Sequence, residues 1–300
     1  MTFTSVVIGV DFSPALSGAG AWIRRFIAPN ASITLVHAHD PTPLPPFLRV
    51  LVRPDALDGS SDLRSAEDQL VAWRDDNGIE DAKIVVEAAR PHELIERVAR
   101  QTHADLVVIG AHGGRERPWQ RIGSTAERLL RTAESSLIVV HGRPREAPRK
   151  LLVAVDDVGI TPRVLGVAGE LADRLDASLN AVHVLSNAAY SHILSIEAAH
   201  SRTSAESREK VAADIAEEAL RWLTALWKNT MRHDKLDAQI RHGVAGDEIL
   251  IAAEQIHAEL IILGRYGIGR VVPAVLGSVV GSVVHGAACP VLVVADSSVA

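Results

Sequence analysis

"ADLVVIG", residues 104–110, decides the fold because the chain contains this segment twice. A shift of 154 residues, the separation of Gly110 and Gly264, places it on "AELIILG", residues 258–264. Each copy contains an apolar run of strand length, residues 106–109 and 260–263, that ends at a glycine. Self-similarity at a fixed offset indicates that a structural unit is repeated. The sequence therefore predicts two copies of one domain.

The residues after both strands share a second pattern. At the same shift, the glycines and serine of one loop fall on those of the other, and both halves contain G-x2-G-x9-G-S: Gly113, Gly123 and Ser124 match Gly267, Gly277 and Ser278. Apolar residues at helical spacing follow in both halves: Ala126, Leu129, Leu130 and Ala133 match Val280, Val283, Val284 and Ala287. We expect a helix after each loop, and then a strand at residues 137–140 and 291–294.

The segment 271–295 contains no acidic or basic residue and is long enough to cross a bilayer. The matching helix of the first half carries Glu127, Arg128 and Arg131, which are costly in hydrocarbon. We therefore expect a buried helix and a strand in this segment, broken at Cys289-Pro290, and no membrane partner.

Each half opens with an apolar run that ends in an acid, namely residues 6–10 before Asp11 and 151–155 before Asp156. Ser13-Pro14 and Thr161-Pro162 are typical of helix starts, because a hydroxyl caps free N–H groups and proline fits the first turn. Further strands are expected at residues 32–38, 82–87 and 178–184, and helices at about residues 62–77 and from about residue 91.

Apolar strands that alternate with amphipathic helices are typical of parallel sheets covered on both faces. We expect an α/β fold of two tandem doubly wound (Rossmann-like) domains, each with a five-stranded parallel sheet and helices on both faces. The first domain is expected at residues 1–143 and the second at 150–300. Residues 144–149, with prolines at 144 and 148, are the expected linker.

The composition excludes several classes of protein. A formal net charge of −6 and a pI near 6.1 argue against a nucleic-acid binder, which needs a basic surface. The single cysteine, Cys289, excludes an internal disulfide framework. Because no basic leader precedes the first apolar run, we expect the protein in the cytoplasm.

If the strand order is 3-2-1-4-5, a ligand binds beyond the carboxyl ends of strands 1 and 4. This order places Asp11 beside Gly110, and Asp156 beside Gly264. Glycine lets a ligand approach the backbone, and the N–H groups of the helix that starts at Gly123-Ser124 favour phosphate. Since Ser13 is expected to cap its own helix, we expect Asp11 to accept hydrogen bonds from ribose hydroxyls.

Three features have two interpretations each, and the plainer one is favoured. The loop arginines either reach outer phosphates or are solvated charges: Arg115, Arg117, Arg121, Arg265 and Arg270. The segment His37 to Asp40, with imidazoles at 37 and 39, either binds a metal or is a structural strand end. The proline-rich segment 41–54 either contacts a partner or is an ordinary surface loop.

The "VDFS" at residues 10–13, with its variant around Asp156, the "VH" pairs at 36–37 and 182–183, and "GAHG" at 110–113 with its G-x9-G-S continuation closely resemble the universal stress protein family. The resemblance implies the sheet order 3-2-1-4-5 and an ATP-binding protein in a stress-response or regulatory role. Asp11 would contact ribose, and Ala38 would contact adenine through its backbone. The remaining residues around ATP would be Ile109, Gly110, Gly113, Gly123, Ser124 and Thr125, and in the second half Asp156, Val184, Leu263, Gly264, Gly267, Gly277, Ser278 and Val279.

The resemblance also implies edge-to-edge pairing of the last strands, 137–140 with 291–294, and a homodimer of such chains. The second copy departs from the pattern, because four residues separate Asp156 from Thr161, so Asp157 is an alternative acid. The first copy has Ala38 where the family often has a larger aliphatic residue, which a backbone contact tolerates.

Binding is favoured over catalysis, because the sequence contains no P-loop lysine motif, no G-x-S-x-G elbow and no acidic pair plainly placed for magnesium. Slow ATP hydrolysis, or self-phosphorylation at Ser124, stays open as the alternative.

Overall fold

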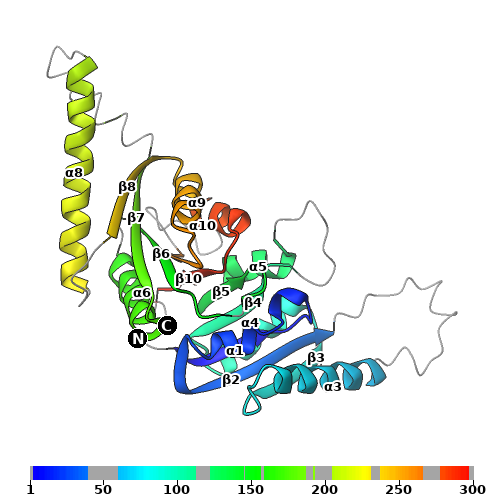
Figure 1. The fold of residues 1–300 in the computed structure, drawn as a ribbon. Coiled ribbons are helices and arrows are strands. Elements are labelled where there is room, and N and C mark those ends of the chain that lie inside the picture. The colour runs from blue at the N-terminus through cyan, green and yellow to red at the C-terminus, as the bar shows by residue number, and fades with distance from the viewer. Residues whose placement is uncertain are drawn as a thin grey trace, which may run out of the picture. The chain divides into compact units, whose positions relative to one another are not determined.

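The computed structural model of the chain describes residues 3–39, 60–112, 122–144, 146–156, 159–186, 192, 205–230, 237–265 and 278–296. The chain divides into two compact units, Thr2–Ala147 and Pro148–Ala300, which we call the N-terminal and C-terminal units. Each unit alternates strands and helices along the chain (Figure 1). The segment 41–54 and the loop residues 113–121 and 266–277 lie outside the described residues.

The described elements of the N-terminal unit are β1 (Phe3–Gly9), a 3-10 turn η1 (Pro14–Leu16), α1 (Ala19–Ile23), β2 (Ile27–His39), α3 (Ser60–Asp76), β3 (Lys83–Ala88), α4 (Pro91–Gln101), β4 (Leu106–Gly110), α5 (Ser124–Thr132) and β5 (Ser136–Val140). Those of the C-terminal unit are β6 (Lys150–Val155), α6 (Thr161–Leu175), β7 (Ser178–Ser186), α8 (Ala205–Thr230), β8 (Asp237–Gly243), α9 (Ala245–Ile256), β9 (Leu260–Gly264), α10 (Ser278–Gly286) and β10 (Val291–Val294).

Both units have a parallel sheet in the expected order. The strands of the N-terminal unit follow the order β3-β2-β1-β4-β5, and those of the C-terminal unit the order β8-β7-β6-β9-β10. In each unit this is the order 3-2-1-4-5, and every pairing within it is parallel. The prediction of tandem doubly wound α/β domains is confirmed.

The central strands are buried on both faces. Val6, Val7 and Ile8 of β1 are successive residues, whose side chains point to opposite faces, and all three are buried. In the C-terminal unit, α9 and α10 lie on one side of the sheet and α6 and α8 on the other (Figure 1). In the N-terminal unit, α4 packs against β1, β2 and α5. Gly9 permits this close packing, since an added Cβ would lie 2.6 Å from Ile95 Cδ1.

The segment after the first strand differs between the units. The predicted helix is present as α6 in the C-terminal unit, but in the N-terminal unit it is a 3-10 turn followed by the five-residue α1. Gly18 separates these two pieces in a left-handed conformation, with φ of 83°, which a continuous right-handed helix does not contain. The prediction of one helix here was therefore wrong.

Each repeat has an ion pair between a strand and a helix, but the acid and the base are exchanged between the two repeats. In the N-terminal unit, Glu87 of β3 accepts hydrogen bonds from Arg97 of α4, the shorter of them 2.5 Å long. In the C-terminal unit, Arg241 of β8 donates to Glu248 of α9 at 2.8 Å. Residues 87 and 241 are related by the shift of 154, so the strand residue is an acid in one repeat and a base in the other.

The apolar C-terminal segment contains the buried helix α10 and strand β10, as expected. Within the described ranges, no helix is long and apolar enough to span a membrane.

Candidate functional site

Asp11 follows β1 and is half-buried. Its Oδ1 accepts the backbone N–H of Ser13 at 2.9 Å, whereas the Ser13 side chain makes no capping hydrogen bond to η1. The expectation that Ser13 caps the turn was therefore wrong, because the carboxylate of Asp11 already holds the turn in place.

The strand-two histidines have the same contact in both units. His37 Nδ1 lies 2.7 Å from the carbonyl oxygen of Val10, and His183 Nδ1 lies 2.9 Å from that of Val155. Because a carbonyl can only accept, Nδ1 carries the hydrogen in each case. Each imidazole thus ties the end of the first strand to the second, which supports the structural interpretation of His37.

Ala38 follows His37 on β2, where it is half-buried and in register with Glu87 of β3. Its backbone lies at the carboxyl end of the sheet, one strand from Asp11. Within the described ranges, no group of three or more potential metal ligands was found.

Two backbone hydrogen bonds hold the start of α5 near the end of β4. The Ala111 N–H donates to the Val140 carbonyl at 2.9 Å, and the Gly123 N–H donates to the Ala111 carbonyl at 2.7 Å. The second bond closes the intervening loop and places the start of α5 directly beyond Gly110. Ile109 is buried there, and Gly110 is half-buried.

Gly123 is the N-cap of α5, and the first intrahelical bond runs from the Glu127 N–H to the Gly123 carbonyl at 3.0 Å. The N–H groups of the residues between them have no helical acceptor, as at any helix start. Ser124 is exposed and Thr125 is half-buried. The free N–H groups and the positive end of the helix dipole therefore lie beside Gly110. This arrangement suits a phosphate.

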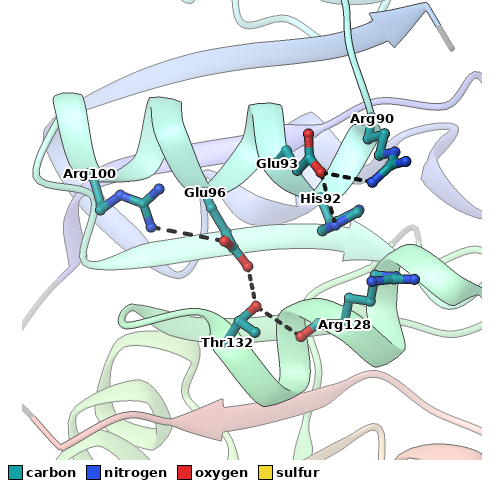
Figure 2. A network of polar contacts seen from close by, with 7 residues as sticks. All are labelled: Arg90, His92, Glu93, Glu96, Arg100, Arg128 and Thr132. Atoms are coloured by element: carbon teal, nitrogen blue, oxygen red, sulfur yellow. Dashed lines mark hydrogen bonds and ion pairs between the residues drawn. The ribbon is translucent and has the colours of Figure 1, made fainter. Parts of the chain in front are cut away.

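Polar contacts join α4 to the C-terminal end of α5. Figure 2 shows Glu96 of α4 reaching the hydroxyl of Thr132, which donates to its carboxylate. Arg100 lies 3.9 Å from the same carboxylate. Because Thr132 is the last residue of α5, the contact restrains the helix at the end opposite the site.

The C-terminal unit repeats the backbone frame with different side chains. Asp156 follows β6, Val184 lies on β7, and Leu263 and Gly264 end β9. Ser278, exposed, and Val279, half-buried, begin α10. Thr161 was expected to cap α6, but Ile160 is the N-cap, and the Thr161 hydroxyl donates to the carbonyl of Asp156.

Arg265, the residue after Gly264, is 3% exposed, so the interpretation of this arginine as a solvated charge was wrong. Its counterpart in the N-terminal unit is Ala111, which is 1% exposed. The remaining residues of the predicted sites lie outside the described residues: Gly113, Gly267, Gly277, Asp157 and the arginines 115, 117, 121 and 270.

Ser13 also lies near Gly110, although its sequence pattern predicts only a helix cap. A Cβ added to Gly110 would lie 3.6 Å from the Ser13 Oγ. The sequence contains one sign of this location, because Ser13 lies two residues after Asp11, the acid that follows β1. The structure thus brings Asp11, Ser13, Gly110 and the Gly123-Ser124 helix start together at one edge of the N-terminal sheet.

Known proteins resemble the chain over nearly its whole length. A universal stress protein of Mycobacterium tuberculosis is 25% identical over 316 aligned residues, which cover 97% of this chain and 96% of that protein. One of Mycobacterium bovis is 26% identical over 318, with 97% of each covered. A solved universal stress protein from Archaeoglobus fulgidus has a TM-score of 0.64 at 16% identity, covering 97% of this chain and 98% of that one.

A putative universal stress protein from Pseudomonas aeruginosa has the same TM-score, 0.64, at 16% identity, covering 98% of this chain and 93% of that one. These two structures support the fold. The model of the universal stress protein family matches the chain twice, at residues 2–141 and 148–295. With both repeats matched, the chain belongs to the universal stress protein family.

Proposed function

We propose that this universal stress protein binds ATP at the carboxyl ends of its first and fourth strands and acts as a nucleotide-dependent stress-response or regulatory protein. In the N-terminal unit, Asp11 accepts hydrogen bonds from the ribose hydroxyls, and the backbone of Ala38 contacts adenine. Gly110 and the start of α5, from Gly123 to Thr125, surround ribose and phosphates. Ile109 and Gly113 complete this site.

The observation that carries the proposal is the hydrogen bond from Gly123 to the Ala111 carbonyl, 2.7 Å long. It holds a helix N-terminus against the glycine that ends β4, beside a carboxylate on the neighbouring strand β1. A carboxylate suits hydroxyl donors, and helix-start N–H groups suit anions. A ribose attached to a phosphate chain matches this pair of preferences.

The magnitudes require several contacts to act together. The helix dipole contributes about 0.3–1 kcal/mol. Micromolar binding needs about 8 kcal/mol. Backbone donors, the Ser124 hydroxyl and packing of the base must supply the remainder. We propose the equivalent residues for the C-terminal unit: Asp156, Val184, Leu263, Gly264, Gly267, Gly277, Ser278 and Val279.

The test compares nucleotide content and ATP binding of the full chain with those of glycine variants. Heat denaturation followed by mass spectrometry identifies released nucleotide, and calorimetry measures added ATP. Gly123 has φ of −73° and ψ of 152°, an extended conformation that valine adopts readily, so Gly123→Val places a side chain on the anion site without straining the backbone.

We expect Gly123→Val to lose ATP binding in the N-terminal unit, and Gly123→Val with Gly277→Val to lose it altogether. Gly166→Val is the control, because an added Cβ on Gly166 meets nothing within 4 Å. A wild-type chain that binds no ATP, or a double variant that binds as the wild type does, would overturn the proposal. Incubation with labelled ATP addresses turnover: product above the double variant's background would replace binding with hydrolysis or phosphotransfer.

A further inference from the structure

The Ser13 hydroxyl is a buried polar group without a structural task. Ser13 is 5% exposed, and among the residues that the structure describes its Oγ has no hydrogen-bond partner. The local turn does not need it, because the carboxylate of Asp11 accepts the Ser13 N–H. A buried hydroxyl without a partner loses its hydration and gains nothing in return, so alanine would be the more stable residue here.

The hydroxyl lies at the candidate site. The nearest atoms to a Cβ added on Gly110 include Leu16 Cγ at 3.5 Å and Ser13 Oγ at 3.6 Å. Gly110 is the residue at which β4 ends, and the start of α5 is bonded to the residue after it. The Ser13 Oγ therefore lies beside Gly110, one of the residues proposed to hold ribose and phosphate, and the Ser13 backbone is bonded to Asp11, another of them.

Among the described residues of the C-terminal unit, no hydroxyl is among the three atoms nearest to the equivalent glycine, Gly264. The nearest atoms to a Cβ added on Gly264 are methyl carbons, Ile160 Cγ2 at 3.0 Å and Val164 Cγ2 at 3.2 Å. The nearby Thr161 hydroxyl donates to the Asp156 carbonyl and is already used. The two repeats thus share a backbone frame but differ in polarity where the fourth strand ends.

We propose that Ser13 donates a hydrogen bond to an oxygen of the ribose–phosphate part of the bound nucleotide, and that the N-terminal unit consequently binds ATP more tightly than the C-terminal unit. The inference rests on the proposed function and names the residue that makes the two sites unequal. A hydroxyl paired with a nucleotide oxygen regains the hydrogen bond lost on burial, whereas methyl groups facing the same oxygen leave it unpaired.

The test is calorimetric titration of ATP and of adenosine into the full chain and its Ser13→Ala variant. We expect Ser13→Ala to weaken the tighter ATP-binding step by about 10-fold, which is near the upper end of the range for a single neutral hydrogen bond. An equal loss for adenosine assigns the contact to ribose, and a loss confined to ATP assigns it to phosphate. The matched control is Ser17→Ala, an exposed serine at the other end of the same turn.

Thermal unfolding without nucleotide separates a ligand contact from a structural one. We expect the melting temperature of Ser13→Ala to equal or exceed that of the wild type, because the substitution removes an unpaired buried hydroxyl. Gly123→Val should remove the tighter ATP-binding step, and Gly277→Val should leave it in place.

Wild-type affinity in Ser13→Ala, or loss of the tighter step in Gly277→Val alone, would overturn this inference while the proposed function stands. Absence of ATP binding in the wild type would instead end the proposed function itself.

Discussion

The thiol of Cys289 lies between α10 and β10, where burial raises its pKa from 9.0 to about 12. A thiol reacts as the thiolate, and at pH 8 the thiolate fraction falls roughly a thousand-fold when the pKa rises by about three units. We expect iodoacetamide to alkylate Cys289 roughly a thousand times more slowly in the native chain than in urea. Similar rates in both states would mean that the native thiol is accessible and ionised.

The same shift has a consequence for stability. Between pH 9.0 and about 12 the unfolded chain releases the thiol proton while the native chain retains it. The contribution of the buried thiol to the free energy of unfolding is therefore complete below pH 9 and is lost as the pH rises. Cys289→Ala should remove the part of the fall in the free energy of unfolding at alkaline pH that comes from this thiol.

Single residues near the site show what the sequence pattern could and could not predict. The acids, glycines and serines of the candidate site could be proposed because each repeat carries them after its first and fourth strands, and they stay predictions. The role of Ser13 was missed because a serine before a proline is a strong cap pattern, and only the geometry shows that Asp11 holds the turn instead. The burial of Arg265 was missed because the charge of a side chain does not reveal what covers it.

At the scale of elements, close contact between α9 and α10 depends on Gly246. A Cβ on Gly246 would lie 2.5 Å from Ser282 Oγ and 2.6 Å from Ser282 Cβ, whereas one on Gly166 of α6 meets nothing within 4 Å. We expect Gly246→Ala to lower the free energy of unfolding by about 1–3 kcal/mol through overpacking. Gly166→Ala should raise it by up to about 1 kcal/mol, because alanine favours helix.

Urea unfolding of both variants measures the difference. Ser282→Gly removes the obstructing atoms and should restore part of the stability lost in Gly246→Ala. Equal effects of the two alanine substitutions would show that α9 and α10 separate without cost.

The strands were predictable because buried parallel strands are continuous apolar runs, and β4, β5, β9 and β10 match their expected residues to within one position at either end. The segment after β1 was not predictable from the same signals. Ser13-Pro14 marks a helix start in the sequence, but nothing in that pair reports that Gly18 adopts a left-handed conformation and interrupts the helix.

At the scale of the whole molecule, the repeat in the sequence was enough to predict two units of the same fold, and the resemblance to the family added their strand order, 3-2-1-4-5. The bounds given for the domains and linker, the pairing of 137–140 with 291–294, the homodimer and the cytoplasmic location stay predictions. The strand pairing and the homodimer depend on contacts between surfaces, which the internal periodicity of a strand or helix does not encode.

We expect the two ion pairs, in which acid and base are exchanged between strand and helix, to affect how the duplicated chain folds. Two similar repeats in one polypeptide can exchange elements while they fold. If β3 docked against α9, Glu87 would meet Glu248; if β8 docked against α4, Arg241 would meet Arg97. Either exchange brings like charges together, whereas docking within a repeat pairs opposite charges.

Reversing one pair makes the repeats alike. Glu87→Arg with Arg97→Glu keeps an ion pair within the N-terminal unit but gives both repeats a basic strand and an acidic helix. We expect an unchanged melting temperature and a lower yield of monomeric protein on refolding from urea. The control is Glu127→Arg with Arg131→Glu, which reverses a pair within α5 alone; equal yields for the two variants would contradict the idea. On this expectation, the exchanged charges let each strand distinguish its own helix from that of the other repeat while the chain folds.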